Sequence, residues 1–197
     1  MNEKELWFKP DESTNTVPKG SRYHLKLHLW YIVRTLLFST SFKPFSSYRC
    51  WLLRLFGAKI GRSVNISPSV VITIPWLVEI GSHSSLDDGC YILGGVRIAD
   101  FVSISNNVSF LGGEHNVTSR ALSDKIKPIV VDDGAFIGAR AILFPGVHIG
   151  QMGVVQAGLT VNMDVKENTI VMAYPAKIIQ LPRLAEEDYN NFKYCDE

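Results

Sequence analysis

The sequence predicts an all-β protein that folds as a parallel β-helix, and three observations lead to this fold class. Aliphatic or aromatic residues recur at every sixth position in three uninterrupted runs. Small or apolar residues recur four positions after the anchors of the last run. A helix of about 3.6 residues per turn would scatter such anchors, whereas one short strand plus one turn repeats on six. The anchors of the three runs are Ile60, Ile66 and Ile72; Ile80, Leu86, Ile92, Ile98, Ile104 and Phe110; and Val131, Ile137, Leu143, Ile149, Val155 and Val161. The small or apolar residues four positions after an anchor are Ala135, Ala141, Val147, Gly153 and Leu159.

The anchors also predict the extent of the β-helix. If three six-residue units make one turn, about five coils lie between Ile60 and Val161. The gap from Ile72 to Ile80 is eight residues, so two extra residues near Pro75 and Trp76 are expected to bulge from one turn. Side chains that we expect to point inward include Ile60, Leu86, Ile104, Ile137, Leu143, Ile149 and Val155.

The longest interruption separates Phe110 from Val131 by 21 residues. Rigid scaffolds carry function on their loops, so this segment is the first place to look for chemistry. Its histidine, His115, follows two glycines that allow the backbone to leave the coil. From spacing alone, a catalytic histidine and an ordinary surface histidine fit equally well. The other four histidines are expected at the surface: His24, His28, His83 and His148.

The chain before the β-helix predicts an arm followed by a helical cap. Residues 1–20 contain Pro10, Pro18 and Gly20, which discourage regular structure. A helix is expected from Tyr23 to about Phe38, and a second, amphipathic helix from Tyr48 to Phe56, ended by Gly57. These helices suit two compatible roles, which are covering the open edge of the first coil and touching an anionic membrane surface. The second role would use Arg49, Trp51, Leu52 and Arg54.

The predicted organisation is therefore an arm and helical cap over residues 1–57, a β-helix over residues 58–182, and a tail over residues 183–197. Two last short strands are expected at Thr169–Met172 and Ile178–Ile179. The acidic segment Leu184–Tyr194 is expected to form a short helix or to fray.

Charge is distributed unevenly along the chain, although the formal net charge is only +1. Nine basic residues and no acidic residue lie between Ser13 and Val78, so all 19 acidic residues lie outside that segment. Such a split suits an anionic partner, a membrane surface or a subunit interface. A nucleic-acid partner is not expected.

Length and apolar content predict one domain, since 197 residues with 46% hydrophobic side chains can build a sizeable core. The three cysteines are widely spaced, and Cys90 falls in a small-residue slot, which favours a buried thiol and a reducing compartment. The apolar run Trp30–Phe38 contains Arg34 and is too short to span a bilayer. No secretory signal stands at the polar start of the chain. A cytoplasmic protein is expected, with peripheral membrane contact left open.

Several segments resemble a known family. The region Pro128–Lys177 contains PIVVDDGAFIGARAILFPGVHIG, VVQAGLTV and AYPAKII, and it resembles the hexapeptide-repeat O-acetyltransferases, including galactoside and maltose acetyltransferases. Upstream, LLRLFGAKIGRSVNISPSV and ITIPW resemble more specifically the acetyltransferases of colanic-acid and other exopolysaccharide clusters. The likeness spans roughly Leu52–Pro182. It implies a left-handed β-helix, which runs against the usual right-handed crossover of parallel strands. It also implies a homotrimer that binds acetyl-CoA as co-substrate between two subunits and uses no metal.

The resemblance also implies roles for individual residues. His115 occupies the position of the family's catalytic histidine, and Phe136 stands where a tryptophan usually packs against the pantetheine arm. Backbone N–H groups that meet the thioester and pantetheine would come from Ala139, beside Gly138, and from Ala157. The family's Asn-Pro-Ala-Lys/Arg segment appears as Tyr174, Pro175, Ala176 and Lys177, with Lys177 suited to the 3′-phosphate of coenzyme A.

The acceptor is less well defined by the resemblance. Sugar acetyltransferases carry acceptor-binding Asn and Asp residues where this chain has Ser85 and Leu93, which argues against the same galactoside or maltose acceptor. Asparagines at 106 and 107 also suit turns. The first expectation is a hydroxyl of an exopolysaccharide or lipid-linked sugar, and a small amino acid, an antibiotic or a free sugar remain alternatives. The residues expected to line the acceptor pocket are Ser85, Asp87, Asp88 and Asn107.

The expected reaction is direct attack of the acceptor hydroxyl on the thioester. A neutral histidine is well suited to take the hydroxyl proton near pH 7, and a backbone amide can stabilise the oxyanion. Two other functions compete with this one. A hexapeptide-repeat carbonic anhydrase would need three histidines around zinc, and the His24/His28 pair lacks a third partner. A non-catalytic trimeric scaffold would not need His115, Phe136 and Lys177 together.

Overall fold

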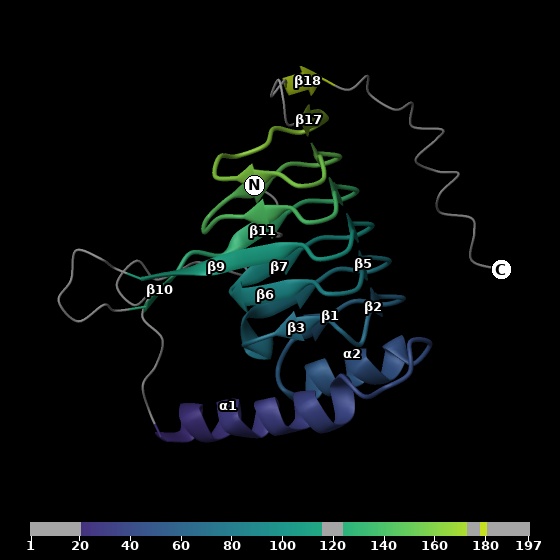
Figure 1. The fold of residues 1–197 in the computed structure, drawn as a ribbon, viewed down its shortest axis with the longest axis vertical. Helices are drawn as coiled ribbons and strands as arrows, with labels where there is room; N and C mark the ends of the chain where they lie inside the picture. Colours follow the sequence, from purple (N-terminus) through teal and green to yellow (C-terminus); the bar gives the residue numbers. More distant parts are fainter. Residues whose placement is uncertain (1–20, 116–123, 173–177, 181–197) are drawn as a thin grey trace, which may run out of the picture.

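The computed structural model describes residues 21–115, 124–172 and 178–180, and the chain winds through them as a three-sided solenoid above two helices (Figure 1). Each side is a parallel sheet, and the chain visits the three sheets in turn. Sheet 1 contains β1 (Lys59–Ile60), β4 (Val78–Ile80), β7 (Val96–Ile98), β11 (Ile129–Val131) and β14 (His148–Ile149).

The other two sheets follow the same order. Sheet 2 contains β2 (Asn65–Ile66), β5 (Ser85–Leu86), β8 (Ser103–Ile104), β12 (Phe136–Ile137), β15 (Val154–Val155), β17 (Thr169–Val171) and β18 (Ile178–Gln180). Sheet 3 contains β3 (Val71–Ile72), β6 (Tyr91–Gly94), β9 (Ser109–His115), β13 (Ile142–Leu143) and β16 (Thr160–Val161), with β10 (Asp124–Ile126) paired to β9.

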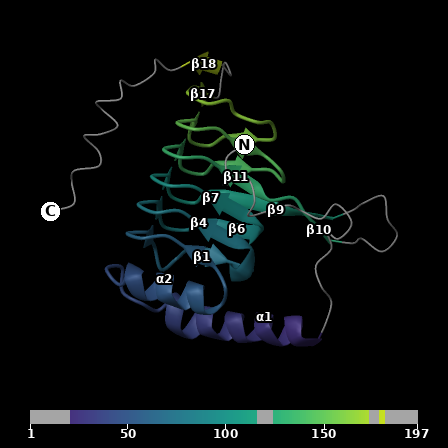
Figure 2. The same ribbon diagram turned by 180° about the vertical axis from the view of Figure 1, so that it is seen from behind.

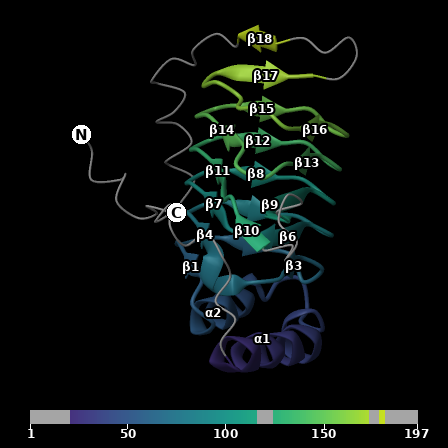
Figure 3. The same ribbon diagram turned by 90° about the vertical axis from the view of Figure 1, so that its left-hand side faces the viewer.

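This arrangement confirms the predicted fold class, a left-handed β-helix. The number of turns is larger than expected, about six rather than five. A bridge between Ile149 and Val165 begins a sixth turn, which continues into β17. The strand β18 then pairs antiparallel with β17 and ends the stack, as Figure 3 shows. The segment after Val161 therefore adds a turn beyond the coils that the six-residue anchors predicted.

The six-residue anchors stack directly on one another and fill the interior. Ile80 pairs in register with Ile60 below it and with Ile98 above it, and the other two sheets repeat this pattern. Full burial of an aliphatic side chain stabilises the fold by about 1.5–3 kcal/mol. Ile60 is only half-buried because it lies at the edge of the first coil. The other predicted inward residues are 0–1% exposed: Leu86, Ile104, Ile137, Leu143, Ile149 and Val155.

The small-residue slot lies at the corners of the solenoid, where little space remains beside the anchors. Ala135 and Ala141 are buried there, and so is Cys90. The Cys90 Sγ lies 3.1 Å from the carbonyl oxygen of Ser105, and burial raises the pKa of this thiol to about 11. The prediction of Cys90 as a core residue is confirmed. Cys50 is also buried and unpaired.

The N-terminal helices cover the open end of the first coil, as predicted (Figures 1 and 2). Of the four residues predicted to touch a membrane, Arg49 and Leu52 are instead buried, whereas Trp51 and Arg54 are exposed. They are α1 (Ser21–Val33), the π-helical continuation η2 (Arg34–Phe38) and α2 (Ser46–Leu55). In later coils, anchor carbonyls accept hydrogen bonds from the coil below, as Ile80 does from the Gly61 N–H at 2.7 Å. The first coil has no coil below it, so side chains of the cap take that place. Trp30 Nε1 donates to the Ile72 oxygen at 2.8 Å, Arg49 Nε to Ile66 at 2.7 Å, and Arg54 Nε to Ile60 at 3.2 Å.

The two predicted interruptions have different structures. The first is a single 3₁₀ turn, η3 (Pro75–Leu77), and its Trp76 lies against α1. The Lys26 Nζ is 4.3 Å from the centroid of the Trp76 ring, and Tyr23 packs edge-on against the same ring. The second interruption is a hairpin, because β9 continues past its sheet as far as His115 and returns as β10.

Several predictions fall outside the described residues. These are the N-terminal arm, the C-terminal helix or frayed tail, Cys195, and the segment holding Pro175 and Lys177. The proposed boundaries at 57/58 and 182/183 also remain predictions. In the described residues, no helix is long and apolar enough to cross a bilayer.

Candidate active site

Most of the predicted site residues lie on sheet 2 or on the turns that connect it to sheet 3. These turns form one edge of the solenoid, here called the 2–3 corner: residues 67–70, 87–90, 105–108, 138–141 and 156–159. The turns stack one above another because the strands β2, β5, β8, β12 and β15 are neighbours in sheet 2. Among the described residues, the acceptor candidates Asp87, Asp88 and Asn107 occupy lower turns, with Ser85 on the adjoining β5. The coenzyme candidates Gly138, Ala139 and Ala157 occupy upper turns, with Phe136 on β12.

The upper part of this corner offers donors and an aromatic surface. Phe136 is 42% exposed on the outer side of β12. Among the described residues, the N–H groups of Ala139 and Ala157 have no backbone acceptor, so both can donate to a ligand. Gly138 is required for this close stacking, since a Cβ there would lie 2.4 Å from the Ala157 nitrogen. These groups fit the thioester and pantetheine portions of a coenzyme A molecule.

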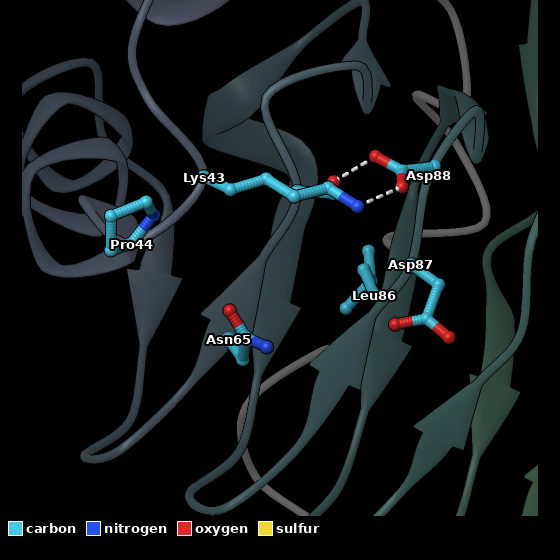
Figure 4. Close-up of a pocket in the computed structure, with 7 residues that line it drawn as sticks. Lys43, Pro44, Asn65, Leu86, Asp87 and Asp88 are labelled. Carbon is cyan, nitrogen blue, oxygen red and sulfur yellow. Dashed lines mark hydrogen bonds and ion pairs between the residues drawn. The ribbon is translucent and has the colours of Figure 1, made fainter.

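The lower part of the corner borders a cleft of about 400 Å³ between the cap and the first two coils (Figure 4). This volume lies within the usual range for small-molecule sites, about 300–1,000 Å³. The cleft carries an ammonium group, an amide, a hydroxyl and two carboxylates over a small apolar floor. Its lining residues are Lys43, Pro44, Asn65, Ser67, Leu86, Asp87 and Asp88.

Asp88 organises the mouth of this cleft. Its Oδ2 lies 2.6 Å from the Lys43 Nζ, and its Oδ1 accepts hydrogen bonds from the hydroxyls of Ser67 and Ser69. The hydrogen bond from Lys43, and then those from the two serines, lower the pKa of Asp88 to about 2. Asp88 is therefore ionised across the physiological range and does not accept a proton there. Asp87 points away from this network and is exposed.

Asn107 has the backbone conformation of a turn residue, with φ of +60°. Asparagine tolerates this left-handed region better than most residues. Its N–H donates to the Asp88 carbonyl oxygen at 2.8 Å, which ties two turns of the corner together. This geometry gives Asn107 a structural reason to be present, and its contact with an acceptor remains a prediction. Ser85 lies in β5, half-buried beside the cleft.

His115 lies at a different edge of the solenoid. It ends β9, where the chain passes from sheet 3 towards sheet 1, and it pairs in register with Asp124 of β10. Figure 1 shows the β9–β10 hairpin projecting on the side away from β2 and β5. The structure thus brings the described coenzyme and acceptor candidates together on sheet 2 and the 2–3 corner, and the strand that ends at His115 leaves from a different edge of the same chain.

The remaining histidines of the solenoid are exposed, as predicted. His148 pairs with Asp132 through Nε2 and Oδ2 at 2.7 Å, and its N–H donates to Asp164. His83 stacks on Phe101 with ring centroids 5.0 Å apart. Neither histidine lies on the 2–3 corner. Within the described residues, no three His, Cys, Asp or Glu side chains form a group that could hold a metal ion.

Sequence reasoning missed three polar residues of the cleft, namely Lys43, Asn65 and Ser67. A signal existed for two of them, because Asn65 pairs in register with Ser85 and Ser67 follows in the same turn position as Asp87. Aligning the coils would have revealed this correspondence. Lys43 reaches the cleft from the loop between η2 and α2, and no repeat connects it to the corner.

A three-sided solenoid with a six-residue period defines the class of hexapeptide-repeat proteins, and comparisons with known proteins narrow this class. No family model matches the chain. A protein of Escherichia coli K12 named as the colanic acid biosynthesis acetyltransferase WcaF is 34% identical over 174 residues, which cover 86% of this chain and 96% of the relative.

Solved structures share the fold. The hexapeptide-repeat acetyltransferase VCA0836 of Vibrio cholerae, complexed with acetyl coenzyme A, matches with a TM-score of 0.73 at 24% identity over 84% of this chain and 92% of that one. A galactoside acetyltransferase in complex with coenzyme A matches with a TM-score of 0.73 at 22% identity over 88% of each chain. The chain belongs to the hexapeptide-repeat acetyltransferase family.

Proposed function

We propose that this protein transfers an acetyl group from acetyl-CoA to a hydroxyl of a saccharide, with His115 as the general base. The observation that carries this proposal is the division of the site residues between two edges of one chain. The 2–3 corner supplies an aromatic surface, free amides and a polar cleft, and the hairpin bearing His115 leaves from the opposite edge. The complete site therefore forms between two subunits of a homotrimer.

Coenzyme A would lie along the upper 2–3 corner. Phe136 would pack against the pantetheine arm, and the Ala139 and Ala157 amides would donate to its polar atoms. Pro175 and Lys177, which lie outside the described residues, would meet the adenosine end, with Lys177 at the 3′-phosphate. When bound, the thioester supplies an activated acetyl group.

The residues of this chain would then perform two tasks. His115 takes the proton of the acceptor hydroxyl, so that the oxygen forms a bond to the acetyl carbon while the carbon–sulfur bond breaks. His115 can then give this proton to the departing thiolate of coenzyme A. The Ala139 amide stabilises the negative charge that develops on the acetyl oxygen. No covalent intermediate on the protein is required.

The cleft supports a polyhydroxylated acceptor. Carboxylate, amide, hydroxyl and ammonium groups within one cleft can donate to and accept from several sugar hydroxyls at once. The name of the Escherichia coli relative also points to polysaccharide biosynthesis. We place the protein in the cytoplasm, in contact with the inner membrane surface through its basic N-terminal helices. A small amino acid or an antibiotic as acceptor, and a non-catalytic scaffold, are the competing functions.

Subunit mixing tests the proposal. Homotrimers of His115→Ala and of Phe136→Glu should each be inactive or nearly so, measured as acetyl-CoA consumption over a panel of saccharides. When the two are unfolded together and refolded, mixed trimers contain one interface with both residues intact. Equal mixing should restore about a quarter of the wild-type activity. A site contained within one subunit would recover no activity, and a protein that does not bind coenzyme A in calorimetry would be a scaffold.

A further inference from the structure

The outer side of α1 and η2 carries an aliphatic stripe that nothing in the described chain covers. Leu25, Leu29, Ile32 and Leu36 are 71%, 53%, 56% and 64% exposed. Their spacing of four, three and four residues places them on one side of a helix, and the fully buried Trp30 lies on the other side. The helix therefore packs on the solenoid with one face and leaves an apolar face outward.

Further exposed apolar residues lie in the following loop and on α2. The Phe42 and Phe45 rings pack edge to face in the loop, and Tyr48 and Trp51 stack on α2 with ring centroids 6.2 Å apart. By comparison, the large exposed apolar residues of the described solenoid are Phe136, Phe144 and Met163. We name these exposed apolar residues of the cap together the cap face: Leu25, Leu29, Ile32, Leu36, Leu37, Phe42, Phe45, Tyr48, Trp51 and Leu55.

The charge around the cap face is of one sign. Every ionised side chain of residues 21–58 is basic, and no acidic residue occurs before Glu79 in the described chain. Arg49 is buried and Lys43 pairs with Asp88, so the exposed charges around the cap face are those of Arg22, Lys26 and Arg54. Aliphatic and aromatic side chains within basic surroundings match the boundary of an anionic lipid bilayer, where apolar groups enter the acyl region and basic groups meet the headgroups. A symmetric contact between two caps would instead bring like charges together, which disfavours a second copy as the occupant.

The cap face also shares a loop with the cleft. Phe42 and Phe45 are exposed, and the residues between them, Lys43 and Pro44, line the cleft. Resting on the proposed function, we propose that the cap face seats this protein on an anionic bilayer and thereby holds the cleft beside a saccharide acceptor carried on a lipid. The acceptor class becomes a lipid-linked sugar, and the water-soluble sugars become poor substrates.

Co-sedimentation with vesicles tests the docking. The wild-type protein should pellet with vesicles containing phosphatidylglycerol and remain in the supernatant with phosphatidylcholine alone. The triple variant Leu25→Gln, Leu29→Gln and Ile32→Gln keeps good helix formers at exposed positions, so it should fold. Its partitioning onto the anionic vesicles should fall by about tenfold or more, because three apolar side chains no longer enter the bilayer. Met163→Gln, an equally exposed residue of the solenoid, should bind vesicles like the wild type.

Three results would overturn the docking proposal: no wild-type binding to anionic vesicles, unchanged binding of the triple variant, or dissociation of its trimer in light scattering. The last would identify the cap face as a subunit interface. Vesicle binding does not require acetyl transfer, so the co-sedimentation assay still tests the docking if the proposed enzymatic function is wrong. Equal acetylation of soluble and vesicle-bound saccharides would overturn the acceptor class alone.

Discussion

The guanidinium of Arg49 donates from Nη2 to the main-chain oxygen of Lys43, the residue whose ammonium binds Asp88. Arg49 is fully buried, and it also donates to the oxygens of Ile66 and Phe42. One side chain thus joins the cap, the first coil and the loop that borders the cleft. Burial lowers the pKa of Arg49, yet arginine remains charged in proteins.

Arg49→Ala should therefore destabilise the protein strongly. The substitution removes the donor from the buried Ile66 oxygen and from the partly buried oxygens of Phe42 and Lys43. The free energy of unfolding should fall by about 3 kcal/mol or more. Arg54→Ala is the matched control, since its side chain also donates to carbonyls of the first coil but is exposed, and its loss should cost about 1 kcal/mol or less. Urea denaturation measures both. Similar losses for the two variants would show that burial of Arg49 is not what matters.

The Lys43–Asp88 pair predicts a pH dependence at the acidic end. The pKa of Asp88 is about 2 in the folded chain against an ordinary value of 3.8, so the pair stabilises the folded state above about pH 4. That contribution is lost as the pH falls towards 2. Both side chains are well exposed, at 71% and 43%, so solvent screening keeps this contribution to stability small.

The measurement is urea denaturation of wild type and Lys43→Met at several pH values. Lys43→Met keeps the length of the side chain and removes its charge. The difference in unfolding free energy should be largest near neutral pH and should vanish at about pH 2. A difference that stays constant over this range would mean that the ion pair does not stabilise the fold.

The period of six was enough to predict the solenoid, because the physical cause of the repeat is local. Each anchor must be apolar to enter the interior, and each turn must return the chain after six residues. Ile137 and Leu143 could therefore be assigned to the core from spacing alone. The bulge at Pro75 could be predicted from the same spacing. The sixth turn was not predicted because the segment from Asn162 to Lys166 lacks an obvious apolar pattern. In this segment a single bridge, between Val165 and Ile149, continues the stack.

Contacts between the cap and the coils were not predictable in the same way. Trp30 and Arg49 look like parts of an amphipathic helix, and nothing in their spacing specifies the carbonyl that each one meets. The contact between Lys43 and Asp88, which lie 45 positions apart in the sequence, was unpredictable for the same reason. The separation of His115 from the 2–3 corner became visible only from sheet order, since sequence distance does not report the edge at which a loop leaves.

Lys177→Ala tests the coenzyme assignment. Lysine binds a phosphate mainly through charge, so loss of Lys177 should weaken binding of coenzyme A but leave dephospho-coenzyme A nearly unaffected. Calorimetric titration of wild type and variant with the two ligands provides the comparison. Equal losses for both ligands would remove Lys177 from the 3′-phosphate site.

His115→Ala tests the catalytic assignment. General-base assistance is worth about 10²–10⁴-fold, so turnover should fall by that order while coenzyme A still binds. The acidic limb that a histidine base gives to the pH–rate profile should disappear in the variant.

His148→Ala is the matched control for this variant. His148 is an exposed histidine of β14 whose Nε2 pairs with Asp132, and it has no part in the proposed site, so turnover should stay near wild type. Near wild-type turnover of His115→Ala on an established acceptor would reject His115 as the base. Its hairpin would then serve the site only by covering a neighbouring subunit's corner, and residual catalysis would come from the corner's amides and the proximity of the two substrates.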